Sequence, residues 1–192
     1  MAKSSSPAFP EETHPRRFTR FVSGRSEADG FWELPPNGLC LSCFVVLSPK
    51  EGAREALVGR IDANQPWLEL GAIDSERALR IGEGWMLPSS HLQQFEPPQQ
   101  AAERILREQL GIELRRLEGP TVVSEAYRRP GLPHSGPHWD IEFVYRASAP
   151  ARWRPQHPAW RELRFVDPAA TPRDQFARSH DEILEQAGFQ IG

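Results

Sequence analysis

The chain has no long apolar run and no strong charge of either sign, and these absences limit its possible functions. No stretch of its 192 residues is apolar over the length that spans a bilayer, and the first residues lack the apolar segment of a secretory signal. A formal net charge of -3 gives no long-range attraction to nucleic acid or to an anionic membrane. We therefore predict a cytoplasmic protein with no nucleic-acid partner and no membrane partner.

Cysteine and lysine are both scarce. The two cysteines, Cys40 and Cys43, lie in the run LCLSCFVVL, where a strand would point them to opposite faces. Reduced core thiols are favoured over a zinc site, which needs two more ligands, and over a redox pair, which normally begins a helix. Because lysine occurs only at Lys3 and Lys50, nearly all basic side chains are arginines, an excess that we attribute to genome composition rather than to phosphate binding.

Length and composition indicate one soluble domain. A chain of 192 residues is long enough for one sizeable core, and 39% hydrophobic with 26% charged residues is ordinary for a globular protein. Residues 1–25 are polar and without period, so they are predicted to form a flexible or loosely docked arm. Residues 26–192 are predicted to form the single domain.

Strands are predicted from apolar runs bounded by turn residues. Leu39–Leu47 and Glu55–Ile61 are separated by the turn-like SPKEGAR, which suggests a hairpin. The long stretch Asp62–Glu83 contains PWLEL, which suggests a short strand. We interpret the whole stretch as a lid or as a contact within a homodimer. Further strands are predicted at Thr121–Arg128, His138–Ala147 and Leu163–Val166.

Two helices are predicted. The first runs from Pro97 to Leu110, because prolines suit a first helical turn, Gly111 suits the C-terminal cap, and the apolar positions between them fall at helical spacing. The second begins at the cap-like Thr171–Pro172 and runs to a stop near Gly188.

The segment GWMLPSSHLQQFEPPQQAAERILREQLGI, residues 84–112, carries the most information about function. It contains a Trp-x-Leu-Pro lead-in, followed at fixed spacings by Glu96, Arg104, Leu106, Glu108 and Gly111-Ile112. This pattern resembles the Nudix box, in which glycine, five residues, glutamate and seven residues precede Arg-Glu-aliphatic-x-Glu-Glu-x-Gly-aliphatic. The resemblance covers roughly residues 39–188. It implies an α/β fold, namely an α/β/α sandwich with a mixed sheet and a loop-helix-loop around the box helix.

Three positions depart from the family pattern. Ser90 stands at the box glycine, Ile105 replaces the glutamate after the arginine, and Gln109 replaces the last glutamate. In lacking a glutamate after the arginine, the box resembles that of the GDP-mannose mannosyl hydrolases. That group, however, keeps the last glutamate of the pair. Two of the three helical carboxylates that hold divalent metal in the family are therefore missing.

Hydrolysis of a diphosphate needs cations on its anionic oxygens and a positioned, deprotonated water, which Mg²⁺ or Mn²⁺ can supply. The resemblance implies a reduced metal site built from Glu108, the backbone carbonyl of Ser89 and a ligand outside the box. Glu142 is the candidate for that ligand or for a base, because strict alternation places it with two other polar side chains on one face of its strand. An ordinary solvent-facing strand side is the alternative.

Other positions are candidates for catalysis, substrate binding or structural support. His134, in the loop GLPHSGPH, is a candidate general base, although a loop histidine without a catalytic role is the alternative. Trp85 can either stack on a base or sugar or pack in the core. Candidate substrate-binding arginines are Arg60, Arg128 and Arg129, and the residues expected to support the box structurally are Arg104, Glu96 and Gly111.

Two functions follow from the sequence. The first is hydrolysis of a nucleoside-diphosphate-linked compound, such as a nucleotide sugar, through a reduced divalent-metal site that depends on Glu108. The second is a non-catalytic module of the same fold, which binds a nucleotide-like ligand or a protein without turning it over. The expected partner of the hydrolase is a small, nucleotide-like molecule.

Overall fold

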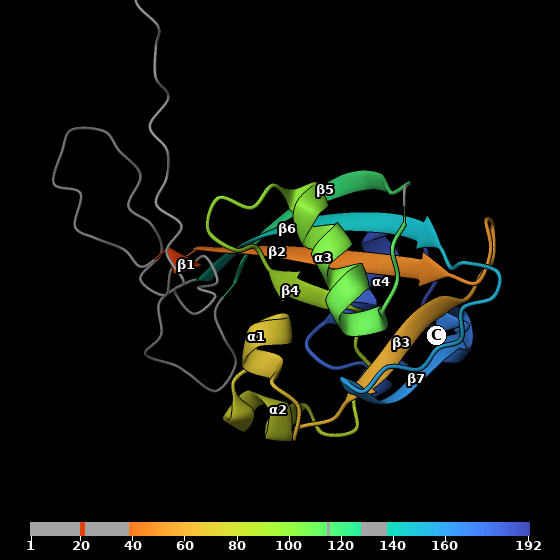
Figure 1. Cartoon of the computed structure of the whole chain (residues 1–192), viewed down its shortest axis with the longest axis horizontal. Helices are drawn as coiled ribbons and strands as arrows, with labels where there is room; N and C mark the ends of the chain where they lie inside the picture. The colour runs from red at the N-terminus through yellow and green to blue at the C-terminus, as the bar shows by residue number, and fades with distance from the viewer. Residues whose placement is uncertain (1–19, 22–38, 115, 128–137) are drawn as a thin grey trace, which may run out of the picture.

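A mixed β-sheet lies at the centre of the fold (Figure 1). In it, β2 (Leu39–Ser48) pairs in parallel with β6 (His138–Ser148), which pairs antiparallel with β5 (Glu118–Tyr127). The other edge of β2 pairs antiparallel with the short strands β1 (Arg20–Phe21) and β4 (Ser89–His91). The sheet therefore combines parallel and antiparallel strands, as predicted.

A second, two-stranded sheet joins β3 (Ala56–Ile61) to β7 (Trp160–Val166) in antiparallel register. An isolated bridge between Gly59 and Met86 links this pair to the chain that leads into β4. The predicted hairpin between the strands now seen as β2 and β3 is wrong. Both edges of β2 are already paired, with β6 on one side and with β1 and β4 on the other, so β3 pairs elsewhere.

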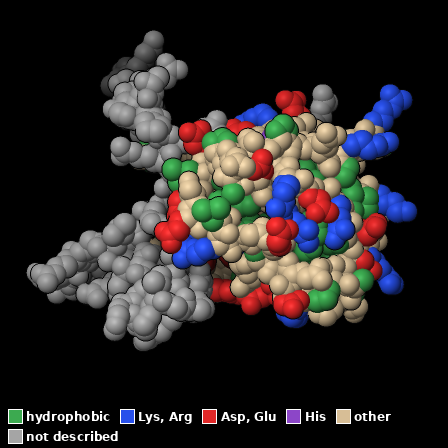
Figure 2. All heavy atoms as spheres, turned by 90° about the horizontal axis from the view of Figure 1, so that it is seen from below, with side chains coloured by type: hydrophobic (Ala, Val, Ile, Leu, Met, Phe, Trp, Pro, Cys, Tyr) green, Lys and Arg blue, Asp and Glu red, His purple; other side chains and the backbone are tan. Residues whose placement is uncertain are grey.

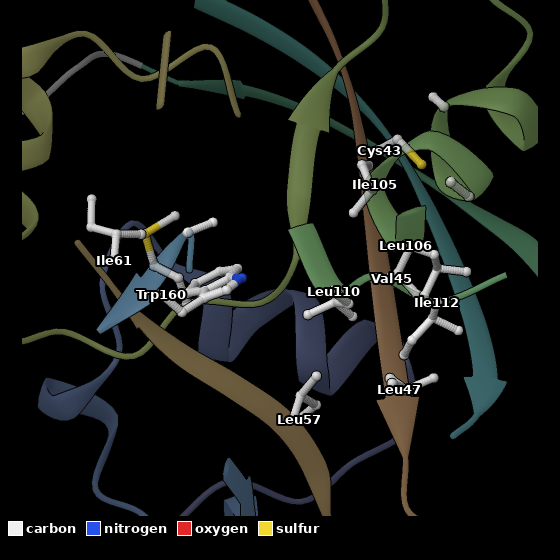
Figure 3. Packing of buried hydrophobic residues seen from close by; sticks show 14 of the residues in the cluster. Cys43, Val45, Leu47, Leu57, Ile61, Ile105, Leu106, Leu110, Ile112 and Trp160 are labelled. Atoms are coloured by element: carbon white, nitrogen blue, oxygen red, sulfur yellow. The ribbon is translucent and has the colours of Figure 1, made fainter. Parts of the chain in front are cut away.

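Two helices cover opposite faces of the central sheet. Figure 1 shows α3 (Pro98–Leu110) on the near face and α4 (His180–Gln186) on the far face. Side chains alternate along β2, so that Cys43 and Val45 pack with α3 (Figure 3), whereas Phe44 and Val46 pack with α4. These three layers confirm the predicted α/β/α sandwich.

The box helix α3 follows its sequence signals closely. Pro97 is the N-cap and Pro98 is the first helical residue. Gly111 ends the helix in the left-handed region, with a φ of 64°, and its N–H donates to carbonyls of the last turn. Ile105 and Leu106 are fully buried against the sheet, so packing of the apolar stripe supplies most of the stability of this helix.

The stretch from residue 62 to residue 83 forms two short helices, α1 (Trp67–Gly71) and α2 (Ser75–Ile81), and the predicted PWLEL strand is wrong. Long-range contacts decide the conformation. The Trp67 indole N–H donates to the Ala159 carbonyl at 3.1 Å, and its ring meets Trp160 edge-on at 4.8 Å. The buried indole thus fixes α1 against the loop before β7.

The C-terminal helix begins later than predicted. Thr171 lies between two single 3₁₀ turns, η1 (Pro168–Ala170) before it and η2 (Arg173–Gln175) after it. Arg178 and Ser179 both have a φ of 56°, in the left-handed region, and this turn re-aims the chain into α4. The prediction that the helix starts at Thr171–Pro172 is therefore wrong.

The structure is a computed structural model that describes residues 20–21, 39–114, 116–127 and 138–192. The predicted N-terminal arm, residues 1–25, lies outside the described residues except for β1. In the described ranges no helix has the length and apolar character needed to cross a membrane.

Candidate functional site

A cavity of about 1050 Å³ opens on the α4 face of the central sheet. We call it the sheet cavity. Its floor is formed by β2, β5 and β6, and its walls by β4, by α2 and by the segment that leads into α4. A volume of this size accommodates a small organic ligand.

Five carboxyl groups line the sheet cavity. Four of them, Glu125, Asp140, Glu142 and Glu182, form what we call the acidic cluster, and the fifth is Asp174. Strand register gathers the first three, because Asp140 lies beside Glu125 on β5 and Glu142 is two residues further along the same face of β6. Burial, together with the neighbouring carboxylates of the cluster, raises the pKa of Glu142 to about 8. Near neutral pH this carboxyl is therefore largely protonated and can donate a hydrogen bond.

Arginines stand on the walls of the same cavity. Arg77 and Arg80 come from α2, and Arg178 comes from the left-handed turn before α4. The N-cap residue Asp74 accepts a hydrogen bond from the Arg77 N–H at 2.8 Å and lies 3.4 Å from its guanidinium, so the cap also orients the side chain. The cavity thus offers cationic groups for an anionic ligand and acceptors for a ligand with N–H or O–H donors.

His180, the first residue of α4, also borders the cavity but has a structural contact. Its Nδ1 accepts a hydrogen bond from the Leu87 N–H at 2.8 Å, and its ring meets Phe44 edge-on at 5.3 Å. Complete burial, together with the positive charge of Arg178, lowers the pKa of His180 to about 3. The neutral imidazole therefore serves as a hydrogen-bond acceptor inside the core.

Arg104 organises the loop before the box helix. Its guanidinium forms two hydrogen bonds with the Glu96 carboxylate, at 2.7 and 2.8 Å, and donates to the His91 carbonyl at 3.0 Å. Glu96 also accepts the Gln93 N–H at 2.8 Å, so this carboxylate ties the loop to the helix. Arg104 and Glu96, both expected to support the box structurally, are thus paired with each other.

Gln109 occupies the centre of the box. Its side-chain amide donates to the carbonyls of Ser89 and Leu70, both at 2.8 Å, and its carbonyl accepts the Ser89 N–H at 3.2 Å. Ile105, one turn earlier on α3, is fully buried among apolar side chains. The Ser89 carbonyl, a candidate metal ligand, already accepts a hydrogen bond, and the donor set around it does not fit a dication.

The remaining candidate metal ligands are not gathered at one point. Glu142 and the Ser89 segment both line the sheet cavity, but Glu108 is not among the described residues that line it. Glu108 is partly buried on α3, and its carboxylate lies 3.5 Å from the Arg107 guanidinium. In the described part of the chain, no three His, Cys, Asp or Glu side chains are placed to hold a metal ion together.

A family model described as NUDIX domain matches residues 75–187, more than half of the chain. The chain belongs to the Nudix family. A comparison with curated proteins finds no match.

Among solved structures, this Nudix protein is similar to the NUDIX domain of Shewanella oneidensis NrtR complexed with ADP ribose. They are 18% identical with a TM-score of 0.50, over 78% of this chain and 86% of that chain. It is also similar to the E. coli dihydroneopterin triphosphate pyrophosphohydrolase, at 15% identity and a TM-score of 0.51, over 76% and 92%. At these identities the likeness establishes the fold.

Two candidate substrate-binding residues of this Nudix protein are packed together. Trp85 is completely buried, and the guanidinium groups of Arg60 and Arg164 lie 4.0 and 4.3 Å from its ring centroid. Arg60 is also 3.2 Å from Glu162. Figure 2 shows a face of the molecule on which basic and acidic side chains lie beside one another. The Trp85 ring is therefore packed in the core in this structure, which was the alternative to stacking on a base or sugar. Neither side chain lines the sheet cavity.

Some sequence candidates are not placed, and some cavity residues were missed. His134, Arg128 and Arg129 lie outside the described residues. Arg77 and Arg80 were missed, because the segment that carries them was expected to contain a strand. The signal for them was present in Asp74-Ser75-Glu76, where a cap residue precedes a polar first turn typical of a helix start.

Proposed function

We propose that this Nudix protein binds a nucleotide-like small molecule in the sheet cavity and does not hydrolyse it through a metal ion held by the box helix. The observation that carries the proposal is the hydrogen bonding of Gln109, whose amide donates one N–H to the Ser89 carbonyl, the candidate metal ligand, and the other to the Leu70 carbonyl. An amide N–H repels a cation, so the box favours binding without metal-dependent turnover.

The charges of the cavity suit a ligand with an anionic end and an end that carries hydrogen-bond donors. Arg77 and Arg80 suit a phosphate or diphosphate, which guanidinium groups bind through paired hydrogen bonds. The acidic cluster suits the hydroxyl and amino groups of a sugar or base, which donate hydrogen bonds to carboxylates. ADP-ribose, which is bound by the NUDIX domain of NrtR, has both ends and is a suitable first compound to test.

A second candidate function is hydrolysis that uses Glu142. A carboxyl group with a pKa near 8 is protonated at neutral pH and can transfer a proton to a leaving oxygen. Under this alternative, water would attack one phosphorus atom of the diphosphate and lose a proton to the solvent. The bond from that phosphorus to the bridging oxygen would break, and Glu142 would protonate the departing oxygen. Conversion of ADP-ribose that disappears in Glu142→Gln favours this alternative, and absence of conversion favours binding alone.

Removal of both cavity arginines is expected to weaken ligand binding. The double substitution Arg77→Ala with Arg80→Ala should raise the dissociation constant for ADP-ribose by roughly 10-fold or more, since a hydrogen bond to a charged group contributes about 1.5–3 kcal/mol. Isothermal titration calorimetry in the presence of EDTA measures this change.

A matched control is Arg152→Ala, which removes an exposed arginine that does not line the cavity. The control should bind ADP-ribose as the unmodified chain does. Equal weakening in both variants would indicate a general charge effect, and failure of nucleoside diphosphates, nucleotide sugars and ADP-ribose to bind the unmodified chain would contradict the proposed function.

A further inference from the structure

We infer that the Gln109 amide takes the place of a metal ion, joining β4 to α1 through hydrogen bonds and fixing the α1–α2 segment as a permanent wall of the sheet cavity. This inference goes beyond the proposed function, because it concerns the box itself and holds whether or not a ligand enters the cavity.

Three backbone groups surround the Gln109 side chain, and their hydrogen-bonding needs determine which side chain fits at this position. The carbonyls of Ser89 and Leu70 need donors, and the Ser89 N–H needs an acceptor. An amide supplies two N–H donors and one oxygen acceptor, so it satisfies all three groups in a single orientation. A carboxylate supplies acceptors only, and would leave both carbonyls facing a like partial charge.

Burial makes this requirement strict. Gln109 is completely buried, so no solvent can compensate an unpaired polar group at this position. A carboxylate there would need a dication to bridge it to the two carbonyls. The neighbouring turn of α3 offers only Ile105, which is apolar and buried, so no second helical carboxylate would help to hold that ion.

The same contact connects two parts of the chain that are distant in sequence. Leu70 lies 39 residues before Gln109 and near the end of α1, and the adjacent Gly71 borders the cavity. Trp67 anchors the start of the same helix through its indole N–H. With both ends of α1 tied to the body of the domain, the segment that carries Arg77 and Arg80 has a fixed base and does not act as a mobile lid.

The decisive experiment compares the unmodified chain with Gln109→Glu and Gln109→Met by thermal unfolding at pH 8, in EDTA and in Mn²⁺. In EDTA, Gln109→Glu should lower Tm by roughly 10 °C, because it buries an uncompensated charge. Mn²⁺ should restore part of that loss by bridging the carboxylate to the carbonyls. Gln109→Met also loses the hydrogen bonds but gains no ligand, so Mn²⁺ should raise its Tm no more than that of the unmodified chain.

Two results would overturn the inference: a Tm of Gln109→Glu equal to that of the unmodified chain in EDTA, or a Mn²⁺-induced rise in the unmodified chain as large as in Gln109→Glu. Should Gln109→Glu fail to fold, the unmodified chain still provides a test. Its Gln109 side-chain amide protons should exchange with solvent as slowly as core backbone amides in an NMR experiment, and rapid exchange would reject the proposed hydrogen bonds.

Discussion

The substitution Arg104→Met is expected to lower the free energy of unfolding by roughly 3–5 kcal/mol, the range typical of breaking a buried ion pair. Arg104 and Glu96 are both almost completely buried and form two short hydrogen bonds with each other. Removal of the guanidinium leaves the Glu96 carboxylate without its counter-charge and removes the hydrogen bond from Arg104 to the His91 carbonyl. Urea unfolding, followed by circular dichroism at neutral pH, measures the loss.

A double variant separates the ion pair from simple packing. Because Arg104→Met with Glu96→Gln removes both charges, it should be clearly more stable than Arg104→Met alone. Arg107→Met, on the same helix but at an exposed position, should change stability by only about 0.5 kcal/mol or less. A double variant as unstable as the single one would show that the cost does not arise from the unpaired carboxylate.

Acidification is expected to destabilise the fold through His180. Its pKa is near 6.5 in the unfolded chain and about 3 in the folded protein, so the unfolded chain takes up the proton first as the pH falls. The stabilisation is therefore fully present above about pH 6.5 and is lost progressively down to about pH 3. Within that window the loss approaches about 1.4 kcal/mol for each pH unit.

The measurement is urea unfolding at several pH values, with His180→Gln as the matched control. The glutamine can still accept the Leu87 N–H but does not titrate, so the variant should lose stability less steeply between pH 6.5 and pH 4. Glu142 contributes a slope of opposite sign, because its raised pKa makes stability fall as the pH rises from about 4.5 to about 8. That contribution is common to both proteins and cancels in the comparison; equal slopes would refute the role of His180.

Local sequence signals predicted those elements whose boundaries are set by their own residues. Pro97 and Gly111 mark the ends of the box helix, and the alternation along β6 correctly divided its side chains between two faces. Predictions failed where a distant contact decides the outcome. The indole of Trp67 binds a carbonyl 92 residues away, and this contact holds PWLEL in a helix although its apolar residues also suit a strand.

The candidate site was predictable to a similar extent. The box spacing identified the helix and loop around Ser89, and strand alternation selected Glu142, which lies in the sheet cavity. The hydrogen bond from Gln109 to Leu70 was not predictable, because α1 comes to the box only through tertiary packing. Sequence alone showed a missing carboxylate at this position, whereas the structure shows that the replacement has hydrogen-bonding partners of its own.

We propose that the Gln109 amide takes the place of a metal ion in the box of this Nudix protein and that ligand binding needs no metal. Paired calorimetric titrations with ADP-ribose, in EDTA and in Mg²⁺, followed by chromatography of the recovered ligand, test it most directly. We predict the same dissociation constant in both buffers and intact ADP-ribose after prolonged incubation. Binding that requires Mg²⁺, or Mg²⁺-dependent conversion of ADP-ribose to AMP and ribose 5-phosphate, would contradict the claim.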